Sequence, residues 1–342
     1  MFSPKNSKKD KLIEGAAVFK RRLPRNIFQG DKEFFEGNLT YSTFNCLIRS
    51  FRKVKVTSDS IAYKNGFLIP ETLYSDENYV YYQTRYPIKQ FFFARRKALD
   101  PRNRYLLATD YYSSGHFHWL TEVLPRLFVA REFLRDAVVL LPDTTYIRQV
   151  GIPSIERIGL KCRDIALLQE GYLYEIPELL LVTKLSRTGQ YHDGVLRSIR
   201  SALGSNQEEG TKRIYVSRER AAFRKVLNES ELVPVLRSAG FEVFRPEELS
   251  FDDQFELFSG SKTIMGIHGA GLTNCLFMPP SGQVVEFRLN ETNVGYWFLA
   301  DALGHDYYYF NGVPDSGHTV IGRGSNLTIP PKLLEEKVLE LL

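Results

Sequence analysis

Cysteine is scarce in this chain, whose 342 residues contain only Cys46, Cys162 and Cys275. They are far apart and odd in number, and no Cys-x-x-Cys pair or Cys/His zinc spacing occurs, which argues against a disulfide framework or zinc site. Such cysteine usage fits a reducing cytoplasm. No window approaches the ~18 apolar residues of a membrane span. The polar, lysine-rich start lacks the apolar segment of a secretory signal.

A strong charge imbalance is also missing. The formal net charge is +5, from 45 basic and 40 acidic residues, and no long basic stripe is present. We therefore expect no nucleic-acid partner. Hydrophobic residues make up 43% of the chain, which is ordinary for a globular protein with a buried core, and the length allows two domains.

Two nucleotide-binding motifs and one metal-binding motif are absent. The chain has neither a Walker loop nor a G-x-G-x-x-G fingerprint. It also lacks an Asp-x-Asp between a strand and a loop, an arrangement that would suit chelation of a divalent cation. Asp252 and Asp253 fall at a predicted helix start, where acids favour the helix dipole. We therefore expect neither a metal nor another cofactor.

Alternating strand and helix patterns predict an α/β protein. Residues 105–109 and 137–142 are expected strands around a helix at 118–134, which Pro125 should kink. Before them, short runs such as 67–70 and 79–84 look like strands. In the second half the expected strands are 213–218, 241–244, 262–267 and 284–287, and the expected helices are 190–203, 228–240, capped by Asn228, and 251–260, capped by Ser250.

This pattern predicts a parallel, doubly wound sheet for the second half. The expected boundaries are a flexible tail over 1–15, an N-terminal domain over 16–185, a C-terminal domain over 186–325 and a C-terminal helix over 326–342.

Candidate ligand residues follow the ends of three strands. They are Ser217 with Arg218, then His268 with Gly269, Ala270 and Gly271, and finally Glu286. Ligands of open parallel sheets bind beyond the carboxyl ends of the strands, and small residues before a helix let a phosphate approach the amides. Glu286 could accept hydrogen bonds from a ribose. A tight turn with a structurally satisfied histidine is the alternative.

Four segments resemble the family 61 glycosyltransferases, which include bacterial polysaccharide enzymes, plant xylan-decorating transferases and the extracellular O-GlcNAc transferase. The segments are HFHWLTEVLPRL at 116–127, YVSRERAAFRKVLNESEL at 215–232, GFEVFRPEELSFDDQFELF at 240–258 and IMGIHGAGLTNCLFMPPSGQVVEF at 264–287. The resemblance implies a GT-B-like architecture, with two Rossmann-like domains whose parallel sheets face across a cleft. It also implies an inverting transfer from a nucleotide sugar bound mostly by the second domain.

Inverting transfer requires a base for the acceptor hydroxyl and stabilisation of the leaving diphosphate. Glu122 matches an acidic position of the family and is the first candidate for the base. His118, one helical turn earlier, is the second, and an ion pair of Glu122 with Arg126 is the structural alternative. The expected donor-binding residues are Ser217, Arg218, Arg224, Lys225, His268, Gly269, Ala270, Gly271, Asn274 and Glu286.

Several further residues have a structural and a functional interpretation. Asn274 could hold the glycine turn or touch the donor, and Trp119 and Trp297 could stack on sugar, although burial is the default for both. The segment 89–104 combines aromatic with basic residues. A strand followed by a basic loop is the preferred interpretation of that segment, with a peripheral membrane contact as the alternative.

The sequence thus predicts a metal-independent glycosyltransferase of polysaccharide biosynthesis, cytoplasmic or membrane-associated. Its expected partners are a UDP-sugar donor and a glycan or lipid-linked glycan acceptor. A non-catalytic scaffold that binds nucleotide sugar or glycan is the main alternative. A nucleotide-sugar epimerase is disfavoured because the chain lacks the dinucleotide fingerprint.

Overall fold

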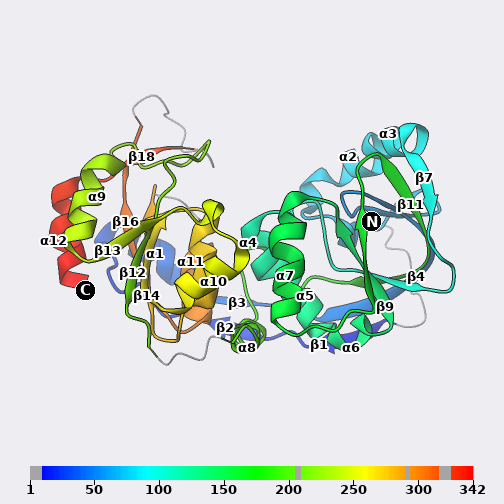
Figure 1. Cartoon of the computed structure of the whole chain (residues 1–342), viewed down its shortest axis with the longest axis horizontal. Coiled ribbons are helices and arrows are strands. Elements are labelled where there is room, and N and C mark those ends of the chain that lie inside the picture. The colour runs from blue at the N-terminus through cyan, green and yellow to red at the C-terminus, as the bar shows by residue number, and fades with distance from the viewer. Residues whose placement is uncertain (1–9, 205–208, 290–292, 316–324, 342) are drawn as a thin grey trace. The chain divides into compact units, whose positions relative to one another are not determined.

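The chain forms two compact units in a computed structural model that describes residues 10–204, 209–289, 293–315 and 325–341 (Figure 1). The first unit comprises Met1–Ala17 and Ser42–Thr188, and the second comprises Val18–Tyr41 and Gly189–Leu342. The predicted boundary near residue 185 lies close to one division point. The assignment of 18–41 to the second unit differs from the prediction. Whether the two units face each other as in GT-B enzymes stays a prediction.

The first unit is built on a nine-stranded mixed sheet with the order β10-β9-β8-β11-β4-β5-β6, to which β1 adds on β4 and β7 on β11. Its strands are β1 (Lys11–Glu14), β4 (Cys46–Thr57), β5 (Ala62–Lys64), β6 (Phe67–Leu68), β7 (Arg95–Ala98), β8 (Arg104–Leu107), β9 (Ala137–Pro142), β10 (Asp164–Leu168) and β11 (Tyr172–Val182).

Only part of this sheet is parallel, so the prediction of a parallel sheet is wrong for the first unit. Strands β7 to β11 pair in parallel, whereas β1, β4, β5 and β6 pair antiparallel with their neighbours. The turn between β4 and β5 is too short for a parallel crossover, because the Thr57 amide already bonds to the Ile61 carbonyl at 3.0 Å. Such a hairpin can only pair antiparallel.

The helices of this unit differ from the prediction in two places. They are α2 (Tyr79–Thr84), α3 (Tyr86–Phe93), α4 (His116–His118), the π-helix η4 (Trp119–Val123), α5 (Leu124–Val129), α6 (Arg131–Leu134), the π-helix η5 (Ile147–Gly151) and α7 (Ile152–Arg157), with the short 3-10 turns η2 (Pro70–Thr72) and η3 (Asp76–Asn78). Residues 79–84 are helical rather than extended. The segment 89–104 begins with the end of α3, which was not predicted, and then contains the strand β7 and a loop before β8.

Proline explains the π-helical turns. Pro125 and Pro153 each follow one of them, at the second position of α5 and of α7. A proline cannot donate to the carbonyl four residues earlier, and a widened turn accommodates that loss without breaking the helix. The disturbance predicted at Pro125 is therefore present as a π-helical turn.

The second unit contains the predicted parallel, doubly wound sheet, with strand order β13-β12-β14-β15-β16. The strands are β12 (Lys212–Val216), β13 (Phe241–Phe244), β14 (Ser261–Ile267), β15 (Gln283–Arg288) and β16 (Asp306–Asn311). The helices are α8 (Asp193–Ala202), α9 (Glu229–Ser238), the short η6 (Pro246–Glu248), α10 (Phe251–Ser259), the 3-10 helix η7 (Ala270–Phe277), α11 (Gly295–Ala302) and α12 (Pro331–Leu341). Helices α9 and α12 lie on one side of the sheet and α10 and α11 on the other (Figure 1).

The segment 18–41 completes the second unit through β2 (Val18–Lys20), η1 (Gln29–Asp31), α1 (Lys32–Gly37) and β3 (Thr40–Ser42). Buried Arg21 forms an ion pair with Asp193 at 2.6 Å. The Phe35 ring packs edge-on against Trp297, with 4.9 Å between the centroids. These contacts assign the segment to a sheet that is far away in the sequence.

The two ends of the chain are more ordered than predicted. Lys11–Glu14 forms β1 instead of part of a flexible tail, and residues 1–9 of that predicted tail lie outside the described residues. At the other end, β18 (Leu327–Thr328) pairs with β17 (Val313–Pro314) before the predicted terminal helix, α12.

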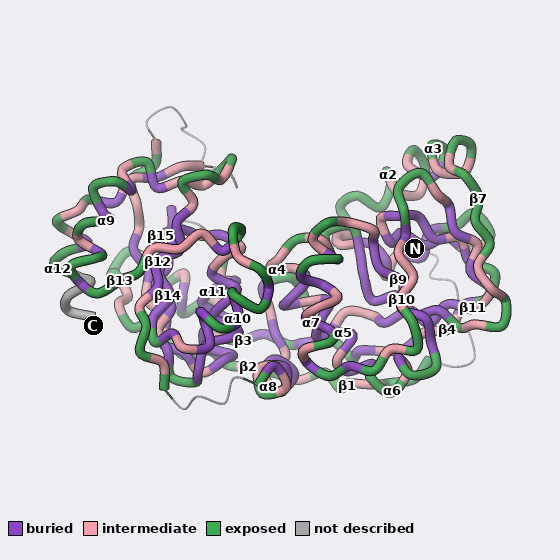
Figure 2. The backbone as a smooth tube through the Cα atoms, viewed as in Figure 1, coloured by how far each residue is buried: buried purple, intermediate pink, exposed green. Residues whose placement is uncertain are grey.

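The central strands of the two sheets and one region of the first unit differ in how far their residues are buried. The central strands are mostly buried, whereas α2, α3 and β7 are largely exposed (Figure 2). Within the part of the chain that the structure describes, no helix has the length and hydropathy needed to cross a bilayer.

Candidate active site

The strand order of the second unit has a topological switch point at β12 and β14. The sheet has the order 2-1-3-4-5 when its strands are numbered along the chain, so β13 is added on one side of β12 and the later strands on the other. Ligands of such sheets bind at the carboxyl ends of the strands at this switch point. Arg218 follows the end of β12 and His268 follows the end of β14. The topology thus brings these two predicted residues to one place.

Arg218 is held in a fixed orientation at this point. Its Nε donates to the Arg224 carbonyl and its Nη2 to the Phe223 carbonyl, both at 3.1 Å. Its guanidinium lies against Gly269, where a Cβ would come within 2.8 Å of Nη1. Burial and the nearby Arg224 lower the pKa of Arg218. Two cations brought together in this way favour an anionic ligand.

His268 is positioned by a carboxylate behind it. Its Nδ1 donates to Glu286, whose second oxygen accepts a hydrogen bond from Tyr307. With the proton on Nδ1, Nε2 accepts from the Asn293 amide at 3.3 Å. The Tyr296 ring lies edge-on to the imidazole at 5.0 Å. His268 is therefore fixed in orientation and tautomer.

Glu286 supports His268 and does not reach a ligand. Its side chain is 1% exposed and both carboxylate oxygens are engaged within the protein, unlike in the predicted contact with a ribose. Burial alone would raise the pKa of Glu286, but His268, with Arg288 and Tyr307, lowers it below its ordinary value.

Lowering of the Glu286 pKa makes stability depend on pH. A carboxylate with a depressed folded-state pKa stabilises the protein above its unfolded pKa of ~4.3, and this contribution is lost as the pH falls through the folded-state value. We expect Glu286→Gln to reduce the free energy of unfolding by ~1–3 kcal/mol at neutral pH and to flatten its decline below about pH 5. Urea unfolding across pH tests this, with exposed Glu242→Gln as the control; equal curves for wild type and Glu286→Gln would contradict it.

The glycines of the His268 turn make room for protein atoms. A Cβ on Gly266 would lie 3.0 Å from the Val216 carbonyl oxygen, and one on Gly271 would lie 2.6 Å from Val216 Cγ1. At Gly269 the same space holds Arg218. The small residues thus let β14 and η7 pack closely on β12. This packing agrees with the alternative of a tight turn, whereas the first prediction was that the small residues let a phosphate approach the amides. The first amides of η7 still lack intrahelical acceptors.

Gly271→Ala is expected to destabilise the protein by ~1–3 kcal/mol, because the new methyl group overlaps Val216. Adding Val216→Ala should restore part of that loss, since it removes the overlapping Cγ1 atom. Thermal unfolding of the two single variants and the double variant measures this coupling. Strictly additive effects would show that Val216 is not the constraint.

Two other predicted donor-binding residues have structural roles. Ser217 is fully buried and donates to Glu229, which also accepts from Tyr215 at 3.1 Å. Asn274 is fully buried and donates to Gln254 at 3.2 Å, which joins η7 to α10. The structure therefore favours the alternative in which Asn274 holds the turn, and it explains the presence of Glu229 and Gln254.

The main chain at Lys225, a predicted donor-binding residue, is anchored by the segment around β18. The Lys225 amide donates to Asn326 at 2.9 Å, and the Leu327 amide donates to the Lys225 carbonyl at 3.0 Å. Asn228 precedes α9 as predicted, but its side chain accepts from the Ile329 amide and does not cap the helix. The accessible donor-side candidates are Arg218, Arg224, Lys225, His268 and the main chain at Ala270 and Gly271.

In the first unit, the π-helical turn brings His118 and Glu122 together, with 3.3 Å between His118 Nδ1 and Glu122 Oε2. Glu122 Oε1 is buried without a hydrogen-bond partner. Arg126 does not pair with this carboxylate: its Nη2 donates to Asp110 at 3.1 Å and its Nε to the Glu122 main-chain carbonyl. The structural alternative for Glu122 is therefore wrong, and the Glu122 side chain is 16% exposed.

Two tyrosines and one aspartate of this region were not predicted from the sequence. Tyr74 and Tyr112 pack on the His118 ring, with centroids at 5.1 and 5.5 Å. Buried Asp110 pairs with Arg126 and accepts from the Tyr112 amide at 3.1 Å, so it shapes the loop before α4. The position of Asp110 just beyond β8 was the available signal.

The two tryptophans are structural. Trp119 is fully buried and donates to Ser154 at 2.8 Å, and Trp297 is 1% exposed and donates to the Arg22 carbonyl at 2.7 Å. Burial, the default interpretation, is confirmed for both.

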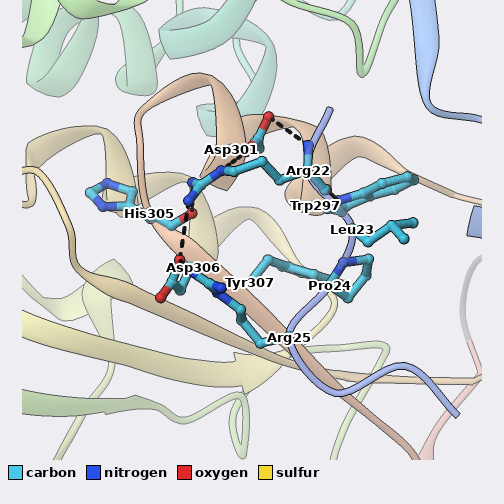
Figure 3. Close-up of a pocket in the computed structure, with 9 residues that line it drawn as sticks. All are labelled: Arg22, Leu23, Pro24, Arg25, Trp297, Asp301, His305, Asp306 and Tyr307. Atoms are coloured by element: carbon cyan, nitrogen blue, oxygen red, sulfur yellow. Dashed lines mark hydrogen bonds and ion pairs between the residues drawn. The ribbon is translucent and has the colours of Figure 1, made fainter. Parts of the chain in front are cut away.

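A pocket of about 380 Å³ lies elsewhere in the second unit, beside the first residue of β16 (Figure 3). Its charges are compensated, because Arg22 pairs with Asp301 at 2.6 Å and Arg25 with Asp306 at 2.9 Å (Figure 3). Burial lowers the pKa of His305, at its wall, to about 4. This pocket lies between segment 18–41 and α11. It is at the amino end of the sheet, whereas ligands of this fold bind at the carboxyl ends of the strands.

No metal centre is apparent in the described ranges, where no three His, Cys, Asp or Glu side chains are grouped as ligands. Asp252 and Asp253 lie in the first turn of α10, and Ser250 caps that helix by accepting from the Asp253 amide at 3.1 Å, as predicted.

Comparison with known proteins identifies relatives that align with part of this chain. An EGF domain-specific O-linked N-acetylglucosamine transferase from Pan troglodytes is 30% identical over 148 residues, or 41% of this chain and 27% of the relative. Alpha-1,3-arabinosyltransferase XAT2 from Oryza sativa subsp. japonica is 32% identical over 94 residues, covering 26% and 16% of the two chains. Protein O-linked-mannose beta-1,4-N-acetylglucosaminyltransferase 2 from Takifugu rubripes is 34% identical over 115 residues, covering 31% and 19%.

The aligned segments thus span about a quarter or less of these relatives. The family model described as Glycosyltransferase 61 matches residues 116–285. This range begins just before His118 and Glu122 and includes Arg218 and the His268 turn. On this match, the chain belongs to the glycosyltransferase 61 family.

Proposed function

We propose that this protein is an inverting, metal-independent glycosyltransferase that moves a sugar from a nucleotide diphosphate, expected to be a UDP-sugar, to a hydroxyl of a glycan or lipid-linked glycan in polysaccharide synthesis. The observation that carries this proposal is the convergence of Arg218, Arg224 and His268 at the switch point of the second sheet. Names of the relatives include N-acetylglucosaminyl and arabinosyl transfer, which supports sugar transfer in general.

In the proposed reaction, Glu122 accepts the proton of the acceptor hydroxyl. The acceptor oxygen attacks the anomeric carbon on the face opposite the diphosphate, and the bond between that carbon and the phosphate oxygen breaks. Its electron pair stays on the departing diphosphate, so the configuration inverts. Arg218, Arg224 and the amides of Ala270 and Gly271 stabilise the developing negative charge, which removes the need for a cation.

The proposal is tested with thermal-shift and transfer assays using UDP-, GDP- and CMP-linked sugars, with and without excess EDTA. We expect one nucleotide class to raise the melting temperature and turnover to be unchanged by EDTA. Turnover that EDTA abolishes and manganese restores would contradict metal independence. Binding without transfer to any glycan would indicate the scaffold alternative.

A further inference from the structure

Helices α2 and α3 and the tip of the β5–β6 hairpin expose an unusual number of large apolar side chains, and strand β7, which follows α3, adds exposed basic side chains. We call this region the α2–α3 surface. Phe92 and Phe93 are 79% and 81% exposed. The other exposed apolar members are Phe67, Tyr79, Val80, Tyr81 and Ile88. Apolar side chains gathered in this way mark interaction sites.

The exposed aromatics are not required for packing within the unit. On α3, Pro87 is buried and Phe91 packs edge-on against buried Tyr63, with 5.3 Å between the centroids. Ile88 and Phe92 are four residues apart and share an outer face, about 100° around the helix from Pro87 and Phe91. Helix α3 is therefore apolar on two faces, and the protein core uses only one of them.

Positive charge surrounds these apolar side chains. Between Tyr79 and Leu99 the sequence has no Asp or Glu. Its basic side chains are all exposed: Arg85, Lys89, Arg95, Arg96 and Lys97. Carboxylates near this segment are Asp59, which accepts a hydrogen bond from Tyr86 at 2.5 Å, exposed Glu77 before α2, Asp100, which pairs with Arg102 at 2.7 Å, and Glu175, opposite Ala98 on β11. The α2–α3 surface thus combines exposed phenylalanines with a cationic rim.

We propose that the α2–α3 surface docks on an anionic lipid bilayer, with Phe92 and Phe93 inserted at the boundary between headgroups and acyl chains. Exposed aromatics beside lysine and arginine are the combination by which peripheral proteins bind such membranes. A second copy fits less well, because a symmetric dimer would bring two equally cationic rims together. This binding does not depend on the transfer reaction.

The test is co-sedimentation of the full chain with vesicles of equal parts phosphatidylcholine and phosphatidylglycerol. We expect binding to these vesicles that weakens with salt, and none to pure phosphatidylcholine. Phe92→Ser/Phe93→Ser should lower the partition coefficient at least about tenfold. Arg95→Gln/Arg96→Gln/Lys97→Gln should lower it by about two orders of magnitude.

Matched controls come from the same unit. Phe44→Ser changes an aromatic side chain that is 41% exposed outside this surface, and Arg131→Gln/Arg135→Gln/Lys161→Gln removes the same charge from exposed positions elsewhere. Both should sediment like the wild type, and melting curves confirm that each variant folds. Absence of wild-type binding, equal losses in the control variants, or a dimer in analytical ultracentrifugation that Phe92→Ser/Phe93→Ser dissociates would overturn the proposal.

Discussion

Glu122→Gln is expected to lower turnover by about 10²-fold or more while leaving donor affinity within a few-fold of the wild type. Glutamine has nearly the shape of glutamate but cannot take a proton from the acceptor hydroxyl. The carboxylate is suited to that task because one of its oxygens is buried without a protein hydrogen bond and Arg126 is engaged by Asp110.

Two further variants make this test specific. Glu132→Gln, on exposed α6, removes a carboxylate of the same unit and should have near-normal turnover. His118→Asn retains Glu122, so it should cost less than Glu122→Gln if histidine only orients the carboxylate or the acceptor. Steady-state kinetics with a saturating donor gives the comparison. A near-normal rate for Glu122→Gln would refute the assignment, and a larger loss for His118→Asn would transfer the role of base to the histidine.

The second sheet was predictable because its signals are local. Each strand is a short apolar run followed by a cap or turn residue, as at Ser250, whose hydroxyl caps α10, and at Gly240, which follows α9 with a φ of 80°. Strands alternating with helices have few stable arrangements, and a parallel sheet is the common one. Strand ends then indicated Arg218 and His268 without any knowledge of the tertiary structure.

Long-range contacts account for what the sequence did not predict. Segment 18–41 belongs to the second unit through pairs such as Arg22 with Asp301, which are 279 residues apart and have no local signature. Residues 79–82 are all apolar or aromatic, so strand and helix patterns fit this segment equally. Helix α2 forms because Tyr82 packs on the cluster that contains Tyr63.

The chemistry of the site was only partly visible for a related reason. Residue type predicted a polar role for Glu286, but only the fold shows that both of its oxygens are used inside the protein. The fit of Gly271 against Val216 depends on distances of a few ångströms between strands. Tyr296, which packs against His268, belongs to no sequence motif that would have predicted its place in the site. A sequence can therefore identify the edge of the sheet that binds a ligand, whereas the residues that support the site emerge from packing.

Arg218→Ala is expected to weaken binding of a nucleoside diphosphate by about 10- to 100-fold, because charge-assisted hydrogen bonds to phosphate are lost. Arg218→Lys should recover only part of the affinity, since an ammonium lacks the planar fork of the guanidinium. Arg220 provides a matched control: it lies in the same loop, is exposed and pairs with Glu248. Arg220→Ala should bind the nucleotide like the wild type.

The phosphate contact is separated from a general loosening of the loop by comparing UDP with UMP in calorimetric titrations at fixed ionic strength. A guanidinium directed at the leaving phosphate adds affinity for the diphosphate, so Arg218→Ala should reduce the preference for UDP over UMP. Loosening of the loop, through loss of the bonds to the Phe223 and Arg224 carbonyls, would weaken both nucleotides alike and lower the melting temperature. Unchanged affinity for every nucleotide would show that the crevice between β12 and β14 is not the donor site.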